Sequence, residues 1–593
     1  MSVGHVGTAI ARSLELHDVP RIFEVPGESF LPVLDGLYES SIDTIVCRQE
    51  GGACYMAEAH GKATGRPGVA MVTRGPGAAN AFVGIHTAWQ DATPLVLFVG
   101  LVPTSDRDRE SFQEFDIKAW FGTQAKRVYV LDDASRASRV VAEAFHLATQ
   151  GRPGPVVIGL PEDVLHQEFT GDLCQPLPAS HGAFSNADLD FLADELRAAE
   201  KPLIFAGGAH WNPDTCAAIQ KFAEKQQIPV VHDWRASDRI ALSSPANAGW
   251  LGYGRNDAAT QLLTEADLVV EIGAVLTDVP TDGYTLRQSL DAKNILINTD
   301  TTLLGNSAAI TRHILASPQV FAEITEELTK RIGSAERVAA DSEASTGTSS
   351  STSTGTDAGT EAGTEAGTGI SATQHEWFTT AHRNHLAFAD VGKPEDWPAT
   401  AQGTAHMAAI MAAIQEQAPH DALYTFGAGN HCLWAQRYLR TETYPSQLSV
   451  RNGSMGYSIP SAVAASLQFP ERTVITIAGD GEYLMNGQEL ATAVQAGAAF
   501  MAVVMSNAEF GTIRTHQLNH YPKRVSGTQL TNPDFAAAAI AYGAHGETVT
   551  SDQDAAGAVE RALAAVREGK PAVINVITDQ ALSIPTVRQN TDE

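Results

Sequence analysis

One stretch near the carboxyl end of the sequence constrains the fold more than any other. Thr473–Ala478 is a short apolar run with β-branched residues, which is typical of a strand buried on both faces of a parallel sheet. Gly-Asp-Gly follows, Asn486–Gly497 has the apolar spacing of a helix, and a second apolar strand, Phe500–Ser506, leads into Asn507. The pattern predicts a βαβ unit in which Asp480 and Asn507 leave the carboxyl ends of parallel strands, where open α/β sheets bind ligands.

These two side chains suit a diphosphate that is held through a metal ion. Mg²⁺ prefers a few hard protein oxygens together with phosphate and water oxygens, and the Asp480 carboxylate and the Asn507 amide supply such oxygens. Gly481 would let the backbone approach the phosphates, and the helix after it would offer unpaired N–H groups. A Gly-Asp-Gly sequence alone is most often only a turn. The asparagine 27 positions further on favours the metal site.

The whole pattern resembles the thiamine-diphosphate motif of the superfamily that contains acetolactate synthase, benzoylformate decarboxylase and pyruvate decarboxylase. The resemblance implies that Asp480, Asn507 and the backbone carbonyl of Glu509 hold Mg²⁺ on the cofactor diphosphate. It also assigns three neighbouring residues to the cofactor site: Gly479, Gly481 and Glu482.

Two upstream segments, 429–435 and 453–460, resemble the same diphosphate-binding part of the family. By that match, Met455 is the bulky apolar residue beneath the bent cofactor, and the Gly453 carbonyl accepts a hydrogen bond from the 4′-amino group. A methionine is more often a core residue, but the flanking glycines and the distance to Asp480 favour the cofactor role. The resemblance places three further residues near the diphosphate: Gly429, Asn430 and His431.

The rest of the sequence alternates apolar strands with helical segments, as parallel sheets covered on both faces require. The expected strands of the first part are Arg21–Val25, Ile42–Cys47, Gly68–Thr73, Leu95–Gly100 and Pro153–Leu160. Those of the middle part are Pro202–Ala206, Ile228–His232, Leu268–Ile272 and Asn294–Asn298. The predicted fold is α/β, with three doubly wound parallel-sheet domains: an N-terminal pyrimidine-binding domain at 1–170, a central Rossmann-like domain at 186–335 and a C-terminal diphosphate-binding domain at 398–584.

Residues 339–371 differ from the rest in composition, because Ser, Thr, Gly, Ala and Glu dominate there. With almost nothing apolar to bury, this segment is predicted to be a flexible, acidic linker between the central and third domains.

The central domain offers little evidence for a nucleotide. Gly207 and Gly208 follow its first expected strand, but two glycines without the rest of the dinucleotide fingerprint are weak evidence. Some members of the superfamily hold FAD, ADP or CoA in this domain, and these residues do not support FAD or another nucleotide here.

Glu50 is the predicted catalytic residue of the first domain. Out of context, a glutamate at a strand end is usually a solvated carboxylate. Here, four segments between residues 48 and 80 resemble the pyrimidine-binding domain of acetolactate-synthase-like enzymes. In that family the matching glutamate hydrogen-bonds the aminopyrimidine N1′ and promotes the imino tautomer that deprotonates the thiazolium C2, and burial favours the protonated carboxyl group that this bond needs. The same resemblance assigns Pro26 and Asn80 to the cofactor site.

Glu50 and Asp480 belong to different predicted domains, yet one cofactor must touch both. In the family, the first domain of one subunit faces the third domain of another. The resemblance therefore predicts a homodimer or a homotetramer with active sites at the subunit interface.

The resemblance predicts decarboxylation of a 2-oxo acid followed by carboligation. Residues 112–114 and Lys126 resemble the segment that lines the acetolactate synthase substrate channel, so Gln113 and Lys126 are predicted to contact the substrate. Arg74 and Arg514 are candidates for binding the carboxylate of the oxo acid. Two departures argue against a standard acetohydroxyacid synthase. Val279 stands where those enzymes place an arginine for the second substrate, and Leu101 follows Gly100 where they have a glutamine.

Two other functions stay open. In a plain 2-oxo acid decarboxylase that releases an aldehyde, Glu28 could handle protons as the aspartate of Pro-Gly-Asp does in that branch, although the paired histidines of that branch are absent. His516 falls where synthases carry a residue that sorts substrates by size, and it could donate a proton, although an exposed loop histidine is an equal alternative. A non-catalytic regulatory paralogue is disfavoured, because the activating carboxylate and the metal ligands are all present.

Composition excludes several classes of protein. The 593 residues carry a net charge of −29, which disfavours nucleic acids and anionic membranes as partners. The sequence contains no apolar run of membrane-spanning length and no signal-peptide pattern, so a cytoplasmic enzyme is expected. The five scattered cysteines argue against both a disulfide framework and a zinc site.

Overall fold

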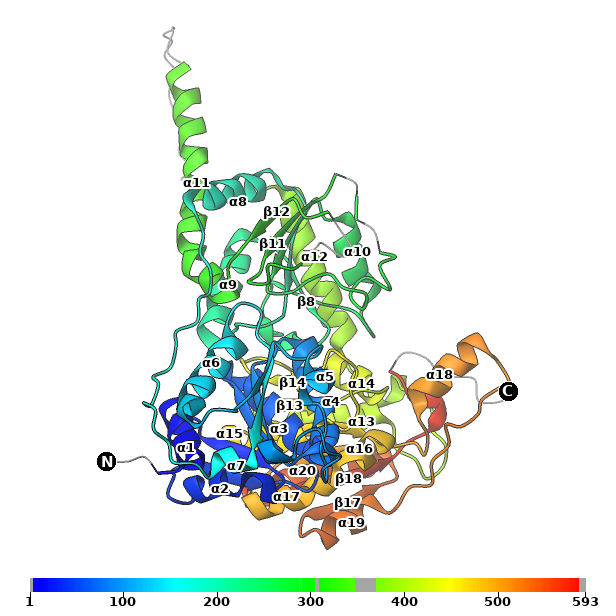
Figure 1. The fold of residues 1–593 in the computed structure, drawn as a ribbon. Helices are drawn as coiled ribbons and strands as arrows, with labels where there is room; N and C mark the ends of the chain where they lie inside the picture. Colours follow the sequence, from blue (N-terminus) through cyan, green and yellow to red (C-terminus); the bar gives the residue numbers. More distant parts are fainter. Residues whose placement is uncertain (1–3, 287, 290, 304–308, 347–369, 586–593) are drawn as a thin grey trace, which may run out of the picture. The chain divides into compact units, whose positions relative to one another are not determined.

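The computed structural model describes residues 4–286, 288–289, 291–303, 309–346 and 370–585 (Figure 1). The chain forms two compact units. The first comprises Met1–Ser180, Trp234–Asp238 and Ala389–Glu593, and the second comprises His181–Asp233 and Arg239–Phe388. Three six-stranded sheets lie in these units, and every pair of neighbouring strands found in them is parallel. The predicted α/β fold with three parallel-sheet domains is confirmed.

The first sheet has the strand order β2-β1-β3-β4-β6-β5. Its strands are β1 (Arg21–Glu24), β2 (Asp43–Val46), β3 (Gly68–Val72), β4 (Leu95–Leu101), β5 (Arg127–Val130) and β6 (Pro155–Pro161). One face packs against α1 (Val6–Leu16), α2 (Leu31–Tyr38), α6 (Ala137–Thr149) and α7 (Glu162–Leu165). The other face packs against α3 (Glu50–Thr64), α4 (Gly75–Asp91) and the short α5 (Ile117–Phe121). All five strands expected in this part are present, and β5 is an addition.

The third sheet repeats this order as β14-β13-β15-β16-β18-β17. Its strands are β13 (Leu423–Phe426), β14 (Gln447–Ser449), β15 (Val474–Gly479), β16 (Met501–Ser506), β17 (His545–Val549) and β18 (Ala572–Ile577). One face packs against α13 (Met407–Gln417), α14 (His431–Tyr438) and α20 (Ala555–Arg567). The other packs against α15 (Ser458–Gln468), α17 (Leu490–Ala496) and α19 (Phe535–Ala541).

The first and third sheets share one hydrophobic core. Residues of α3 and α4 lie in the same buried cluster as residues of α15 and α17. At its centre the ring of Tyr55 on α3 meets the ring of Tyr457 edge-on, with centroids 5.4 Å apart, and both side chains are fully buried. This continuous apolar contact explains why residues so far apart in sequence form one compact unit.

The helix predicted at Asn486–Gly497 is wrong in its bounds. A helix, α16 (Asp480–Asn486), begins directly at the end of β15, and a single turn of 3₁₀ helix, η6 (Gly487–Glu489), separates it from α17. Asn486 ends α16 with φ −139°, and its side-chain amide donates to the Gly456 carbonyl at 2.8 Å. Gly497 ends α17 in the left-handed conformation, as predicted.

The central sheet has the order β12-β11-β10-β7-β8-β9, which is the Rossmann order. Its strands are β7 (Pro202–Ala206), β8 (Val230–Asp233), β9 (Asn247–Leu251), β10 (Leu268–Ile272), β11 (Lys293–Ile297) and β12 (Arg312–Ile314). Its helices are α8 (Asn186–Ala198), α9 (Pro213–Gln226), α10 (Asp257–Glu265), α11 (Pro318–Thr346) and α12 (Ala372–Ala389).

Most of the predicted linker, 339–371, lies outside the described residues. Helix α11 covers its first residues, 339–346, and 347–369 lie outside the described residues. Almost all of α12 belongs to the same unit as the central sheet, where the Trp377 indole donates to the Pro202 carbonyl at 3.0 Å. The segment therefore interrupts the central unit and does not separate it from the third sheet. Apolar side chains of α12 pack in the unit of the central sheet, so the chain returns to that unit after the linker. The composition of the linker alone gives no information about this packing.

Candidate functional site

A cavity of about 220 Å³ lies at the carboxyl edge of the third sheet. Eleven of the residues predicted from the sequence line it: Gly429, Asn430, His431, Gly453, Met455, Gly479, Asp480, Gly481, Glu482, Asn507 and Glu509. They come from the ends of β13, β15 and β16 and from the loop before α15. The strand ends therefore bring together side chains that are nearly 80 residues apart in the sequence.

Asp480 is the buried carboxylate of this cavity. Its Oδ2 accepts hydrogen bonds from the Ala508 backbone N–H and from the Asn532 amide, both at 2.7 Å, and its Oδ1 accepts from the Gly481 N–H at 2.8 Å. Burial raises the pKa of Asp480, although these three bonds oppose the rise. In the described part of the chain, no basic side chain lies within ion-pair distance of this carboxylate. A bound metal cation would supply the missing positive charge.

Asn507 and Glu509 complete the predicted metal ligands. Ala508, between them, adopts the left-handed conformation with φ 57°, which is strained for a residue with a side chain and turns both residues toward the cavity. The Asn507 amide oxygen accepts the Glu509 N–H at 3.2 Å and keeps a second lone pair. These are hard oxygens with a single carboxylate among the side-chain ligands. Within the described residues no group of three or more His, Cys, Asp or Glu could hold a metal ion, so a softer, multi-histidine site has no counterpart here.

The side chain of Glu509 is also buried in the cavity wall. Its Oε2 lies 3.3 Å from Arg514 Nε, and its Oε1 has no hydrogen-bond partner. Burial, with a smaller contribution from Asp480, raises the pKa of Glu509 to about 7, while Arg514 opposes the rise. Arg514 is itself buried, and this contact occupies one side of its guanidinium.

His431 and Glu482 are two further polar residues in the wall of the 220 Å³ cavity. Glu482 accepts hydrogen bonds from the Ser458 N–H at 3.0 Å and the Ser458 hydroxyl at 2.7 Å, and burial raises its pKa to about 7. Burial, assisted by the charge of Arg235, lowers the pKa of His431 to about 3, so the imidazole is neutral. Its ring edge faces two glycines, since a side chain at Gly429 or Gly479 would meet His431 within 3 Å. Glycine at both positions therefore keeps the imidazole edge open toward the cavity.

Residues 449–457 carry Gly453 and Met455 into the cavity. Gly453 has φ 72° and open space around it, so its backbone faces the cavity without a side chain. The Met455 carbonyl accepts a bond from the Tyr55 hydroxyl at 3.3 Å. These contacts leave the methionine side chain free to line the cavity.

Sequence reasoning missed several cavity residues: Ala428, Met505, Phe510, Gly511, Thr512 and Ile513. It also missed Asn532, which orients the Asp480 carboxylate from a loop that in sequence resembles an ordinary Asn-Pro turn. The apolar members belong to strand or helix patterns and gave no separate signal. His516 does not line the cavity: it is exposed on α18 (Gly511–His520), and Ile513 of the same helix lines the cavity instead.

Glu50 lies at the carboxyl edge of the first sheet, as the first residue of α3. It is half-buried, and its Oε2 accepts a hydrogen bond from the Asn80 amide at 2.9 Å. Glu50 does not line the 220 Å³ cavity, whose wall residues all come from Ala428–Ile513. Within one chain, the predicted metal ligands therefore line the 220 Å³ cavity of the third sheet, whereas the predicted catalytic glutamate lies at the edge of the first sheet and outside that cavity.

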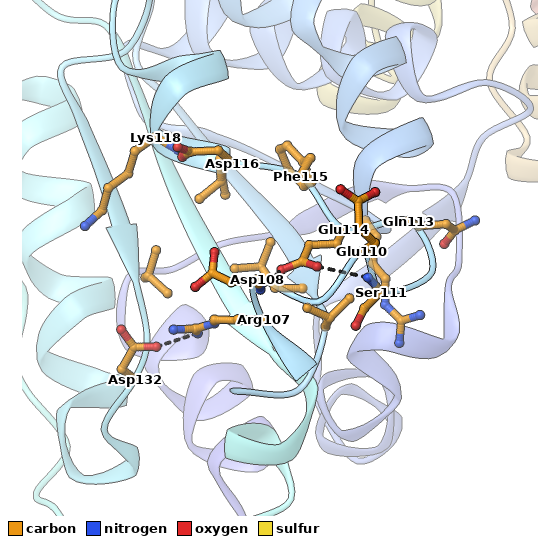
Figure 2. Close-up of a pocket in the computed structure, with 15 residues that line it drawn as sticks. Arg107, Asp108, Glu110, Ser111, Gln113, Glu114, Phe115, Asp116, Lys118 and Asp132 are labelled. Carbon is orange, nitrogen blue, oxygen red and sulfur yellow. Dashed lines mark hydrogen bonds and ion pairs between the residues drawn. The ribbon is translucent and has the colours of Figure 1, made fainter. Parts of the chain in front are cut away.

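A second, larger pocket of about 700 Å³ lies at the same edge of the first sheet (Figure 2). Gln113 and Arg74 line it, together with a segment that runs from Arg107 to Lys118. Glu114 closes that segment, since its carboxylate accepts the backbone N–H groups of Asp108 at 2.6 Å and Ser111 at 3.0 Å.

The other candidate substrate residues have partners of their own. Arg74 is buried and pairs with Glu162 at 2.5 Å and with Glu28 at 3.3 Å, so its charge is already compensated. Glu28 is mostly exposed, and Pro26 beside it is exposed as well. Lys126 lies outside the pocket lining, and its ammonium donates to the carbonyls of Gln150 and Arg152 at 2.5 and 2.8 Å.

The chain is similar to known proteins along most of its length. Three family models match it: the N-terminal TPP binding domain of thiamine pyrophosphate enzymes at residues 4–120, their central domain at 189–325 and their C-terminal TPP binding domain at 427–576. The acetolactate synthase isozyme 2 large subunit of Escherichia coli (strain K12) is 26% identical over 561 residues, covering 93% of this chain and 92% of the relative.

Two further relatives have similar coverage. The acetolactate synthase large subunit of Lactococcus lactis subsp. lactis (strain IL1403) is 29% identical over 542 residues, which are 90% of this chain and 86% of the relative. The mitochondrial acetolactate synthase of Schizosaccharomyces pombe is 29% identical over 586 residues, with coverage of 93% and 81%. Among the described helices, none is long and apolar enough to cross a membrane.

Proposed function

The chain belongs to the family of thiamine pyrophosphate enzymes and is acetolactate-synthase-like, and from that premise we propose that it decarboxylates a 2-oxo acid and joins the remaining fragment to a second carbonyl compound. We propose further that Mg²⁺ holds the cofactor diphosphate. The observation that carries the proposal is the 220 Å³ cavity, where the buried Asp480 carboxylate, which has no basic side chain within ion-pair distance among the described residues, faces amide oxygens and exposed glycine backbone.

The residues of this cavity fit the cofactor. Asp480, Asn507 and the Glu509 carbonyl would hold Mg²⁺, and the neutral His431 would contact the diphosphate. Met455 would support the bent cofactor from below, and the Gly453 carbonyl would orient its 4′-amino group. When bound, the cofactor supplies an electron sink for the carbanion that decarboxylation leaves. Met505, Phe510 and Ile513 add apolar surface to the cavity wall, beside the place where the bond would form.

The proposed active site needs a second copy of the chain. Glu50 is half-buried and hydrogen-bonded to Asn80, and it does not line the cavity that holds the metal ligands of its own chain. We propose a homodimer in which the first-sheet edge of one copy covers the third-sheet edge of the other. Glu50 would then exchange a proton with the cofactor N1′, and the partner would bury the carboxyl group.

The 700 Å³ pocket would lie on the substrate side of such a site. Gln113 offers an amide there whose side chain makes no hydrogen bond that we observe within the described part of the chain. Arg74 is neutralised by Glu28 and Glu162, so a substrate carboxylate would have to displace one of these acids or bind elsewhere. Because Glu28 is the weaker and more exposed partner, it is the one that substrate would displace.

Glu28 also bears on the alternative function, a decarboxylase that releases an aldehyde. It is mostly exposed at the first-sheet edge, and once a substrate carboxylate displaces it from Arg74, its carboxyl group could carry a proton to the carbanion. In that reaction the fragment leaves after protonation and meets no second carbonyl compound.

One assay separates the two functions. Purified protein is supplied with thiamine diphosphate, Mg²⁺ and a panel of 2-oxo acids that begins with pyruvate, and both carbon dioxide and the carbon product are recorded. We expect a 2-hydroxy-3-oxo acid of the acetolactate type. Free aldehyde as the only carbon product would replace carboligation by simple decarboxylation, and no carbon dioxide from any acid would refute both.

A further inference from the structure

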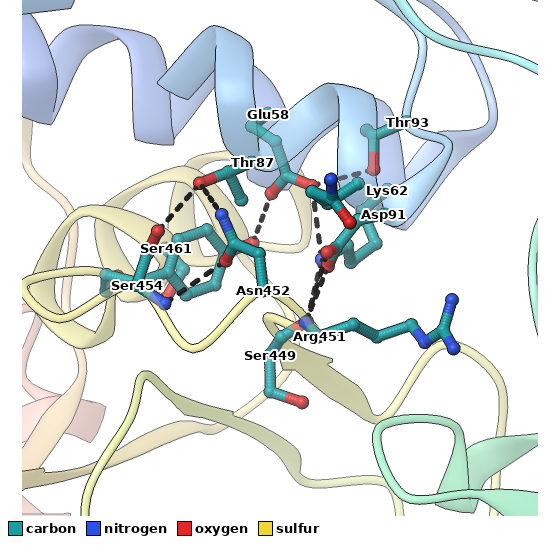
Figure 3. Close-up of polar contacts among 12 residues, drawn as sticks. Glu58, Lys62, Thr87, Asp91, Thr93, Ser449, Arg451, Asn452, Ser454 and Ser461 are labelled. Atoms are coloured by element: carbon teal, nitrogen blue, oxygen red, sulfur yellow. Dashed lines mark hydrogen bonds and ion pairs between the residues drawn. The ribbon is translucent and has the colours of Figure 1, made fainter. Parts of the chain in front are cut away.

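A buried polar cluster lies where the first and third sheets share their core (Figure 3). We call it the Glu58 cluster and define it as Glu58, Lys62, Asp91, Thr93 and Tyr457. The Lys62 ammonium lies 2.6 Å from the Asp91 carboxylate and 3.1 Å from that of Glu58. Glu58 also accepts hydrogen bonds from the Thr93 hydroxyl at 2.7 Å and the Tyr457 hydroxyl at 2.6 Å. Every member but one is nine-tenths buried, and Lys62 has a side-chain exposure of only 14%.

The two charges at the edge of the cluster hold the beginning of the cofactor loop, residues 449–457. Lys62 donates to the Ser449 carbonyl at 2.7 Å. Asp91 accepts the Arg451 backbone N–H with both oxygens, at 3.0 and 3.1 Å. Helices α3 and α4 thereby fix two points of the backbone just before Gly453.

Further contacts from the same helices fix the rest of the loop. The Thr87 hydroxyl lies 3.1 Å from the Ser454 hydroxyl and accepts a bond from the Asn452 amide at 3.0 Å. Asn452 in turn accepts the Ser454 N–H at 3.1 Å. With the Tyr55 bond to the Met455 carbonyl and the Tyr457 bond to Glu58, α3 and α4 hold the loop from end to end.

Stability alone does not explain such a cluster. Buried ion pairs lose so much hydration that apolar side chains of the same volume usually stabilise a protein as well or better. The segment between β14 and α15, with left-handed glycines at 453 and 456, would otherwise be free to move, and ordering it upon ligand binding costs conformational entropy. Fixing it beforehand removes this cost from cofactor binding.

We propose that Lys62, Thr87 and Asp91 are positioning residues that hold the cofactor loop, so that Gly453 and Met455 are in place before the cofactor binds. The inference rests on the proposed function, because it takes the loop to be part of a thiamine-diphosphate site. It adds that cofactor affinity depends on side chains of α3 and α4 that never touch the cofactor.

The test measures thiamine-diphosphate binding by calorimetry at fixed Mg²⁺, the thermal midpoint of the cofactor-free protein, and kcat at saturating cofactor. Lys62→Met removes the bond to Ser449 and is expected to raise the dissociation constant roughly tenfold. Thr87→Val removes only an uncharged hydroxyl, keeps the buried charges balanced, and is expected to raise it about threefold. Lys62→Arg keeps a donor and should recover part of the affinity. For every variant kcat at saturating cofactor should change far less than affinity.

A matched control is available in the other compact unit. The Lys293 ammonium lies 2.6 Å from the Glu195 carboxylate, so Lys293→Met also removes a paired lysine, and it should leave the dissociation constant unchanged. If Lys62→Met does not fold, Thr87→Val decides. An unchanged dissociation constant in the folded variants, with only a lower thermal midpoint, would overturn the proposal. Asp480→Ala in the same titration distinguishes the failures, because wild-type affinity in that variant would refute the proposed site itself.

Discussion

The first and third sheets share one strand order, and their carboxyl edges are chemically different. The third-sheet edge gathers glycines, amides and the buried carboxylates of Asp480, Glu482 and Glu509 around a small cavity of about 220 Å³. The first-sheet edge gathers charged side chains, among them the paired Arg74 and Glu162, around a pocket of about 700 Å³. Topology therefore decides where a ligand can bind, and the residues at the strand ends decide which part of the chemistry each edge performs.

We assign binding of the cofactor to the carboxyl edge of the third sheet. Proton transfer and contact with the substrate are assigned to the carboxyl edge of the first sheet. Both assignments are proposals, and variants at one edge should leave the task of the other intact.

The largest effect is expected from Asp480→Ala. Removing the carboxylate deletes a metal ligand and the acceptor of the Ala508 and Asn532 bonds, so Mg²⁺-dependent cofactor affinity should fall at least about a hundredfold. Calorimetric titration of thiamine diphosphate with and without Mg²⁺ measures it. Asp534→Ala is the control, because Asp534 only caps α19 through the Ala537 N–H and should cost about 1 kcal/mol of stability without loss of affinity. Equal losses in the two variants would refute the special role of Asp480.

Glu50→Gln should affect turnover and spare binding. The amide cannot exchange a proton with the cofactor, so kcat should fall on the order of a hundredfold or more. Cofactor affinity should stay within a few fold, in contrast to Asp480→Ala. Initial rates with a saturating 2-oxo acid, measured beside the titration, check both statements. Unimpaired turnover in Glu50→Gln would contradict the proposal that proton transfer occurs at the carboxyl edge of the first sheet.

Gln113→Ala should have a smaller effect on the first edge. Loss of one amide contact is expected to raise KM for the 2-oxo acid roughly fivefold, with cofactor affinity unchanged. Lys126→Met serves as its comparison, since Lys126 binds two backbone carbonyls outside the pocket and should change stability more than KM. A larger rise of KM in Lys126→Met than in Gln113→Ala would place the substrate elsewhere.

The smallest effect on activity is expected in the central sheet, which belongs to neither edge. Glu271 is buried on β10, and burial raises its pKa to about 7, against an ordinary value of 4.5. The folded state then binds more protons than the unfolded state between pH 4.5 and 7, so this residue lowers stability as pH rises through that window.

Glu271→Gln should therefore be more stable than wild type above pH 7, by about 3 kcal/mol, and the gap should close toward pH 4.5. Chemical denaturation across this pH range measures the difference, and turnover should be unchanged. A gap that does not vary with pH would show that Glu271 does not titrate in the folded protein.

The sequence predicted the strands well where apolar residues run without interruption. Pro202–Ala206 and Leu268–Ile272 were predicted with the bounds the structure shows, because a strand buried on both faces leaves an unbroken apolar run. Helices near the site were harder. Asp480 and Gly481 look like a turn in the sequence, yet they begin α16, and the Asp480 carboxylate accepts the backbone N–H of Ala508, which follows much later in the chain.

The hydrogen-bond and ion-pair partners of the site residues could not be predicted from the sequence. Arg74 looked free to bind an anion, and only the fold places Glu162, 88 positions away, against it. Asn532 and the Glu58 cluster were invisible for the same reason, because a contact between distant strands or helices leaves no periodic signal. The metal ligands could be predicted because a βαβ unit fixes where two successive strands end.

Hybrid dimers test the central claim, that each active site joins the first edge of one copy to the third edge of another. Glu50→Gln and Asp480→Ala chains are co-expressed in equal amounts, and the turnover of the mixture is compared with that of each variant alone. If the site is shared, half of the dimers are hybrids with one site free of both substitutions, and about a quarter of wild-type activity should return. If both edges of a site came from one chain, the mixture would stay as inactive as its components.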